Sequence, residues 1–197
     1  MSYRKENKYK VTPYDALIAK ENLISKGMLR LYPERLIASQ YFDTTDSRMF
    51  MESEEGLLPR KKFRVRWYNR SMEKMYFEEK ISSIEGRFKK THLIDYDNFL
   101  KLVSNGFLQG NYGNIVPSVK VVYQRNYFSY SDLRFTFDNN ISYHFSDSSI
   151  ILKDPLQVIE IKAPINCPDD YIDSIFPAPK SRFSKYSRAF LMRLGHI

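Results

Sequence analysis

The chain has 197 residues, of which 43% are hydrophobic and 15% aromatic, so it can fold as one domain over residues 1–197 and is not a disordered chain. Its formal net charge of +8 predicts an acidic partner: nucleic acid, anionic lipid or a phosphorylated small molecule. The single cysteine, Cys167, excludes an internal disulfide and fits a reducing compartment. We find no signal peptide and no apolar run of membrane-spanning length, so we expect a cytoplasmic protein without a membrane segment.

The first half of the chain predicts strands with one early helix. Residues 4–11 have the pattern of a strand. Thr12, Pro13 and Asp15 have the types and spacing of an N-cap, a first helical residue and a capping box, so a helix should follow and end before Gly27. Further strands are expected over residues 36–43, 61–69, 74–82 and 87–94.

The second half predicts more strands and three further helices. One helix should begin after Asp95 and end before Gly106, a short one should follow Pro168, and a last one should cover residues 183–194. Strands are expected over residues 118–128, 132–138, 141–146, 149–153 and 156–163. Eight or more short strands with polar turns and a few helices predict an α+β, mainly β fold, either a barrel or a sandwich.

Three of the predicted strands contain a glutamate two residues before a lysine. The pairs are Glu6 with Lys8, Glu78 with Lys80, and Glu160 with Lys162. A spacing of two places both charges on one face of a strand, and apolar residues occupy the other face. A single strand of this kind is usually a half-exposed antiparallel strand.

Arginines repeat the same arrangement. Lys62, Arg64 and Arg66 share one strand face, and Arg125 and Arg134 alternate with apolar or aromatic residues in later strands. Arginine binds phosphate through two parallel hydrogen bonds and is permanently charged. The repetition favours a closed antiparallel barrel with a charged, anion-binding lumen over a set of unrelated solvated strands.

Glu160 is the first candidate for a metal ligand. It lies among valine and isoleucine in a predicted strand, and a carboxylate beside bound phosphate suits Mg²⁺ or Mn²⁺. Glu6 and Glu78 are weaker candidates, which could equally keep neighbouring lysines in place. The histidines lack zinc or triad spacing, no glycine-rich phosphate loop is present, and Asp43 is expected to shape a turn.

Eight short motifs follow one another along the chain. They are Arg4-x-Glu6-x-Lys8-Tyr9, Tyr41-Phe42-Asp43, Arg64-Val65-Arg66-Trp67-Tyr68, Glu78-Glu79-Lys80, Tyr123-Gln124-Arg125-Asn126-x-Phe128, Arg134-x-x-x-Asp138, Glu160-Ile161-Lys162 and Phe183-Ser184-Lys185-Tyr186. In type and order they resemble the VTC domain, the catalytic module of the vacuolar transporter chaperone polyphosphate polymerases. That family belongs to the triphosphate tunnel metalloenzymes.

The resemblance implies a closed antiparallel barrel of about eight strands, a tunnel whose basic residues grip a triphosphate or polyphosphate. Together with the strand faces, it assigns catalytic roles to Arg64, Arg66, Lys80, Arg125 and Arg134. Phosphate-binding roles go to Lys8, Lys62, Arg87, Lys89, Lys162 and Lys185, of which Lys185 rests on the resemblance alone. One further basic position of the family is blurred in Arg87-Phe88-Lys89-Lys90, so either Arg87 or Lys89 fills it. Glu160 matches the metal ligand.

The reaction expected from the resemblance is metal-dependent transfer of the γ-phosphate of ATP to a growing polyphosphate, with Mn²⁺ or Mg²⁺ as cofactor. The closest alternative is a triphosphatase of the same superfamily, in which water attacks. A non-catalytic polyphosphate-binding module is a third interpretation. Nucleic-acid binding ranks last, because over residues 63–68 the cations and most of the aromatics alternate between opposite faces. Eukaryotic members carry a phosphate-sensing domain and membrane helices, and we expect neither from this sequence. A separate membrane partner is compatible with the sequence, which does not specify an oligomeric state.

Overall fold

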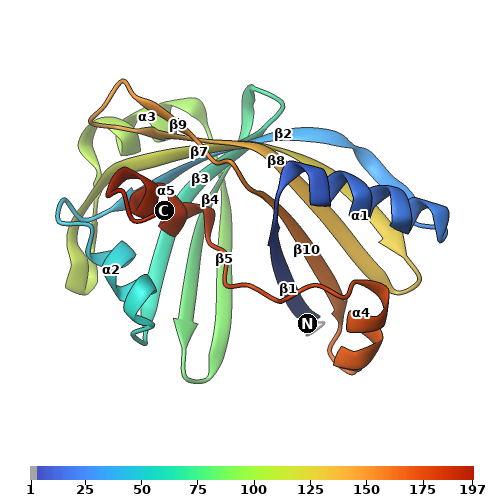
Figure 1. Cartoon of the computed structure of the whole chain (residues 1–197). Coiled ribbons are helices and arrows are strands. Elements are labelled where there is room, and N and C mark those ends of the chain that lie inside the picture. Colours follow the sequence, from blue (N-terminus) through green and yellow to red (C-terminus); the bar gives the residue numbers. More distant parts are fainter. Residues whose placement is uncertain (1–3) are drawn as a thin grey trace. The chain divides into compact units, whose positions relative to one another are not determined.

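The computed structural model describes residues 4–197, which form ten strands, five α-helices and one 3-10 helix (Figure 1). The strands are β1 (Arg4–Val11), β2 (Leu29–Asp43), β3 (Arg60–Tyr68), β4 (Ser71–Ser83), β5 (Gly86–Ile94), β6 (Phe107–Gln109), β7 (Gly113–Tyr130), β8 (Leu133–Phe145), β9 (Ile151–Lys153) and β10 (Gln157–Pro164). The helices are α1 (Pro13–Ser25), α2 (Arg48–Glu55), α3 (Tyr96–Asn105), α4 (Asp169–Ile175) and α5 (Lys185–Arg193), with η1 at Gly110–Tyr112. None of these helices is long and apolar enough to cross a membrane.

The strands belong to one sheet with the order β1-β10-β8-β7-β2-β3-β4-β5, to which β6 adds beside β7 and β9 beside β8. The pairs β1–β10, β10–β8, β2–β3, β3–β4, β4–β5 and β6–β7 are antiparallel. The expected antiparallel, mainly β fold is therefore confirmed. Strands β1 and β5 end this order, and no hydrogen-bonded pairing joins them within residues 4–197, so the expected closed barrel is not confirmed.

The chain folds into two compact units. The first comprises the chain up to Arg35 together with Tyr123–Ile141 and Lys153–Phe183. The second comprises Leu36–Val122, Ser142–Leu152 and Ser184–Ile197. Strands β2, β7 and β8 contribute residues to both units, and each unit has an apolar core of its own.

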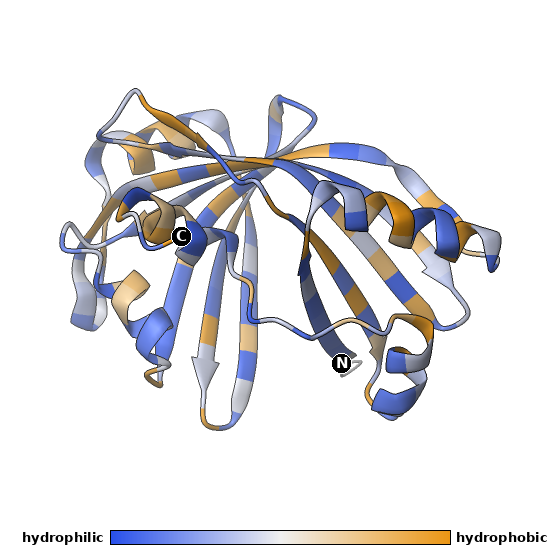
Figure 2. Cartoon of the chain, viewed as in Figure 1, coloured by the Kyte–Doolittle hydropathy of each residue, from blue (hydrophilic) through white to orange (hydrophobic). Residues whose placement is uncertain are grey.

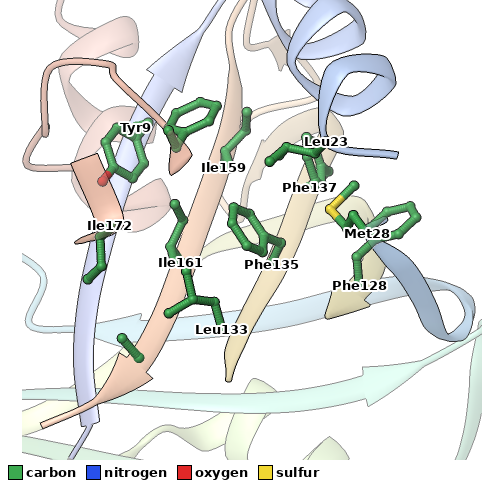
Figure 3. Close-up of a cluster of buried hydrophobic side chains, with 12 residues drawn as sticks. Tyr9, Leu23, Met28, Phe128, Leu133, Phe135, Phe137, Ile159, Ile161 and Ile172 are labelled. Atoms are coloured by element: carbon green, nitrogen blue, oxygen red, sulfur yellow. The ribbon is translucent and has the colours of Figure 1, made fainter. Parts of the chain in front are cut away.

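The core of the first unit lies on one face of β1, β10 and β8. Tyr9, Ile159 and Phe135 point to the same side, where Leu23 of α1 and Ile172 of α4 pack against this side of the sheet (Figure 3). All five side chains are at most 2% exposed. Residues two apart in a strand share a face, so the positions between these core residues lie on the other side.

The core of the second unit is built in the same way. Phe63, Val65 and Trp67 of β3 are buried together with Phe42 of β2, and α3 contributes Phe99. The Phe99 ring meets Trp67 edge-on, with ring centroids 5.5 Å apart. Arg64 and Arg66 alternate with Phe63, Val65 and Trp67 along β3 and therefore lie on the opposite face of the sheet.

Hydropathy alternates along the strands, as the ribbons of β8 and β10 show (Figure 2). Period-two alternation is what a sheet with one face buried requires. In each unit, one face of the sheet is apolar and covered by a helix, and the other carries charged side chains.

Two predicted helix starts are confirmed. The Thr12 hydroxyl accepts a 3.1 Å hydrogen bond from the Asp15 backbone N–H and donates one of 2.7 Å to the Asp15 carboxylate, which fixes the start of α1. Asp95 accepts a 2.7 Å hydrogen bond from the Asn98 backbone N–H at the start of α3. Such caps satisfy backbone donors that the first helical turn leaves unpaired.

Two expectations differ from the structure, and one helix was not expected. The separate strands predicted over residues 132–138 and 141–146 are one continuous strand, β8, in which Asn140 takes a positive φ of 50°. Strand β2 begins at Leu29 rather than at residue 36. Helix α2 was not predicted, because the side chain that caps it is not that of the N-cap residue. Its N-cap residue Ser47 makes no side-chain cap bond, whereas Asp43 accepts hydrogen bonds from Met49 and Phe50.

Candidate functional site

Strand register gathers the predicted cations of the second unit on one face. Arg64 pairs with Tyr41 of β2 on one side and with Glu78 of β4 on the other. Lys80 pairs with Lys62 and with Lys89 of β5. Residues that pair across an antiparallel ladder share a face. The face carries Ser39, Tyr41, Lys62, Arg64, Arg66, Tyr76, Glu78, Lys80, Arg87 and Lys89. We call it the β2–β5 cationic face.

Glu78 fixes two of these cations. Its carboxylate accepts a 2.6 Å hydrogen bond from Arg64 Nε and also contacts Nη2, and its other oxygen accepts a 2.5 Å bond from Lys89 Nζ. Burial would raise the pKa of Glu78, but the charges of Arg64, Arg66 and Lys89 lower it to about 2. Glu78 is 3% exposed and stays ionised as a partner of its neighbours. This geometry matches the alternative role that the sequence left open for it.

Tyr41 is a member of this face that sequence reasoning missed. Its hydroxyl accepts a 2.9 Å hydrogen bond from Arg64 Nη1. Burial would raise the pKa of Tyr41, but the charges of Arg64, Arg66 and Lys80 lower it to about 7. No pattern within β2 signals this, because the significance of Tyr41 depends on the arginine beside it in β3.

Helix α5 is anchored beside Tyr41. The Tyr186 ring stacks on Tyr41 with centroids 5.0 Å apart, and its hydroxyl donates a short hydrogen bond to Asp43. Burial raises the pKa of Asp43 and, together with the Asp43 charge, raises that of Tyr186. Asp43 thus joins the start of α2 to α5, which is more than the turn expected from the sequence. Lys185 begins α5, next to Tyr186.

Two further cations have partners on this face. Lys62 Nζ donates to Ser184 Oγ at 3.3 Å and lies 5.2 Å from the centre of the Tyr186 ring. Arg66 Nε donates to Ser39 Oγ at 3.1 Å. These hydroxyl and aromatic partners are neutral and orient the two cations.

The β2–β5 cationic face has an excess of positive charge. Among the residues named above for this face, Glu78 is the one carboxylate, because Glu79 lies on the other side of the sheet. The charge of Arg64, followed by desolvation and the charge of Arg66, lowers the pKa of Lys80 to about 7. A lysine that loses its proton so easily marks a place where additional negative charge would be stabilised.

The first unit has its own charged face on β1, β10 and β8. Glu6 pairs with Lys162, Lys8 pairs with Glu160, and Lys162 pairs with Arg134. Lys162 Nζ lies 3.0 Å from Glu160 Oε1 and 3.9 Å from Glu6 Oε2, while Lys8 Nζ lies 3.1 Å from Glu6 Oε1. The two carboxylates therefore share one ammonium group.

Arg125 also lies beside this cluster. Its Nε and Nη2 donate hydrogen bonds of 2.5 and 2.6 Å to the two oxygens of Asp138, which is fully buried. Desolvation opposes the charged form, but Asp138 raises the pKa of Arg125 above its usual value. Burial would raise the pKa of Glu160, but Arg125, Lys162 and Lys8 lower it. Asp138 is thus the ion-pair partner of Arg125. It belongs to one of the motifs found in the sequence, but no role was predicted for it.

The candidate donors for a metal ion are carboxylates of the first unit. Within residues 4–197 no group of three or more histidine, cysteine, aspartate or glutamate side chains could hold a metal. Glu6 and Glu160, however, both reach the Lys162 ammonium, so they could share a divalent cation in its place. Mg²⁺ is often held by one or two carboxylates with substrate phosphates and water, so this pair fits such an ion. Glu78 belongs to the second unit and is occupied by Arg64 and Lys89.

The sequence model of the VTC domain matches residues 3–192. The chain belongs to the VTC domain family. No curated protein sequence matches it. In this VTC domain, Arg87 and Lys89 both lie on the β2–β5 cationic face, and Lys89 contacts Glu78.

Solved structures show that the fold of this VTC domain recurs at low sequence identity. A candidate adenylate cyclase from Bacillus halodurans has a TM-score of 0.61 at 12% identity, covering 93% of this chain and 94% of that one. A candidate adenylyl cyclase from Hippeastrum, described by a dominant triphosphatase activity, has a TM-score of 0.61 at 14% identity, covering 98% and 96%. A conserved hypothetical protein from Pyrococcus furiosus has a TM-score of 0.56 at 11% identity, covering 93% and 99%.

Proposed function

We propose that this VTC domain is a phosphotransferase that transfers the γ-phosphate of ATP to a growing polyphosphate. The observation that carries the proposal is the β2–β5 cationic face, where Arg64, Arg66 and Lys80 lie in register around one carboxylate. Such a face suits a ligand with several negative charges. Membership of the VTC family also supports the proposal. The tunnel expected from the sequence, with these charges in its lumen, would hold such a ligand.

In the proposed reaction, an oxygen of the terminal phosphate of the acceptor forms a bond to the γ-phosphorus of ATP. The bond from the γ-phosphorus to the bridging oxygen breaks, and ADP leaves with that electron pair. The nucleophile comes from the acceptor, so the protein contributes positioning and charge stabilisation. Arg64 and Arg66 are suited to this because a guanidinium binds two phosphate oxygens at once.

The same role is proposed for the cations of the first unit, Lys8, Arg125, Arg134 and Lys162. Glu160, with Glu6, would hold a Mn²⁺ or Mg²⁺ ion there. When bound, such an ion neutralises phosphate charge. The Lys162 ammonium group would then turn from Glu160 toward phosphate, because the metal ion would take the place beside the two carboxylates that this ammonium group occupies.

Triphosphate hydrolysis is the second candidate. The triphosphatase activity named for the Hippeastrum protein favours it, since that protein has the same fold. Hydrolysis needs the same positioning of the triphosphate, with water replacing the acceptor phosphate. A binding module without turnover is the third interpretation, and the carboxylate pair Glu6 and Glu160 argues against it.

One assay distinguishes the three. The protein is incubated with ATP and Mn²⁺, and the products are separated into acid-labile polymer, free phosphate and unchanged ATP. We expect polymer together with ADP. Free phosphate without polymer would show that the protein is a triphosphatase and not a polymerase. Unchanged ATP, together with measurable ATP binding, would show that the protein is a binding module.

A further inference from the structure

The β2–β5 cationic face changes character along its length. On β3 the side chains of this face run from Lys62 through Arg64 and Arg66 to Tyr68, as the pairing with β2 shows, and the pairing with β4 shifts register after Arg66. On β4 they run from Lys80 through Glu78 to Tyr76. On β5 they end at Leu93, which pairs with Tyr76. Three neighbouring strands thus change from charged to apolar residues at the same end of the face.

The apolar end is accessible rather than buried. Leu93 is 65% exposed, and Tyr68 and Tyr76 are both half-buried. The two tyrosine rings meet edge-on, with centroids 6.3 Å apart and planes at 70°. Neither ring belongs to the buried cluster on the opposite face. A partly exposed aromatic pair of this kind can receive a flat apolar group.

The apolar end continues directly from the cations. Tyr76 pairs across the ladder with Arg66. Lys80 and Tyr76 are four residues apart, which is about 13 Å along a strand. A triphosphate chain with a ribose at its end suits this span, with the phosphates on the cations and the base beyond them.

We propose that Tyr76, with Tyr68 and Leu93, is a stacking platform for the base of a nucleoside triphosphate. This inference rests on the proposed function and adds the residues that would hold the base of its donor nucleotide. Stacking on an aromatic ring tolerates every base, because each base presents a flat face. The platform therefore accepts purine and pyrimidine nucleotides alike.

The test compares two ligands with one variant. Binding of ATP and of inorganic tripolyphosphate is measured by titration calorimetry without divalent metal, so that turnover does not interfere. Tyr76→Leu should weaken ATP binding roughly 5- to 150-fold, the range that loss of one stacked base represents, and leave tripolyphosphate binding unchanged. Tyr76→Phe keeps the ring and should bind ATP like the wild type. Tyr96→Leu, an exposed tyrosine on α3, is the matched control and should change neither ligand.

A second measurement needs no variant. The triphosphate of 2-aminopurine riboside loses fluorescence when its base stacks, so binding to the wild-type protein should quench it. If the wild type binds tripolyphosphate but Tyr76→Leu leaves ATP binding unchanged, or weakens both ligands equally, the platform is wrong while the proposed function stands. Bound nucleotide without quenching would overturn the platform in the same way. If the wild type binds neither ligand, the proposed function falls, and the platform falls with it.

Discussion

Arg64 and Glu78 face each other across β3 and β4, and the arginine Nε donates a 2.6 Å hydrogen bond to the carboxylate. The second oxygen of Glu78 accepts the Lys89 ammonium from β5. A single buried carboxylate therefore fixes cations from two neighbouring strands. It orients both of them on a face where cationic side chains outnumber carboxylates.

Replacing Glu78 by glutamine should destabilise the free protein. Loss of one partner from a buried ion pair costs about 3–5 kcal/mol, because the remaining charge stays buried. The Tm of Glu78→Gln should therefore fall, and saturating tripolyphosphate should raise it by more than it raises the wild-type Tm, since the anion replaces the lost charge. Glu79→Gln is the control, because Glu79 pairs with Lys61 on the opposite face. Equal behaviour of the two variants would count against the role of Glu78.

Acid should remove the same contribution in the wild type. The pKa of Glu78 is lowered from 4.5 to about 2, so its stabilisation is present above pH 4.5 and lost as the pH falls toward 2. A shift of this size corresponds to about 3 kcal/mol in the free energy of unfolding. Urea unfolding at pH 6 and pH 3 should show a larger loss for the wild type than for Glu78→Gln. Parallel losses in the two proteins would show that Glu78 does not contribute.

Glu160→Gln should separate turnover from binding. Glutamine keeps the size of the side chain but removes the charge that a divalent ion requires. Turnover of ATP with Mn²⁺ should fall by at least about 100-fold, the scale of losing one strong electrostatic contribution to the transition state. Tripolyphosphate binding should change little, because the arginines and lysines remain. Wild-type turnover by Glu160→Gln would mean that Glu160 is only the ion-pair partner of Lys162 seen in the structure.

Triphosphate binding should weaken as the pH rises through about 7. The free protein holds Lys80 and Tyr41 with pKa values of about 7, and a bound anion favours the protonated form of both, so binding takes up protons. Lys80→Arg keeps the charge at all pH values and should reduce the slope of log Kd against pH between 6 and 9, leaving the part that Tyr41 contributes. Titration of the ligand itself is the same for both proteins and cancels in the comparison. An unchanged slope would show that Lys80 is already protonated in the free protein.

The strand faces could be predicted because they depend on local spacing. Period-two alternation within β3 is enough to place Arg64 and Arg66 on the face opposite Phe63. The helix cap at Thr12 follows from the types of Thr12, Pro13 and Asp15. Both features are decided within a few positions of the chain, where the geometry of a strand or a helix start leaves few alternatives.

The partnerships could not be predicted, because they depend on register between strands. Glu78 contacts Lys89 because β4 and β5 pair with one register, and a shift by one residue would move Lys89 to the other face. Tyr41 gains its low pKa only from cations on β3 and β4. Helix α2 was missed for a similar reason, since Asp43 caps it from the end of β2.

The most direct test of the central claim, that the β2–β5 cationic face binds a phosphate chain, is calorimetric titration of tripolyphosphate into two double variants. Arg66→Met with Lys80→Met removes two charges from the face, and Lys61→Met with Lys90→Met removes two from the opposite side of β3 and β5. Each charge-assisted hydrogen bond contributes about 1.5–3 kcal/mol, so the first double variant should lose at least about 100-fold in affinity. The second should stay close to the wild type. Equal losses in both would mean that tripolyphosphate responds only to net charge, which would contradict the account.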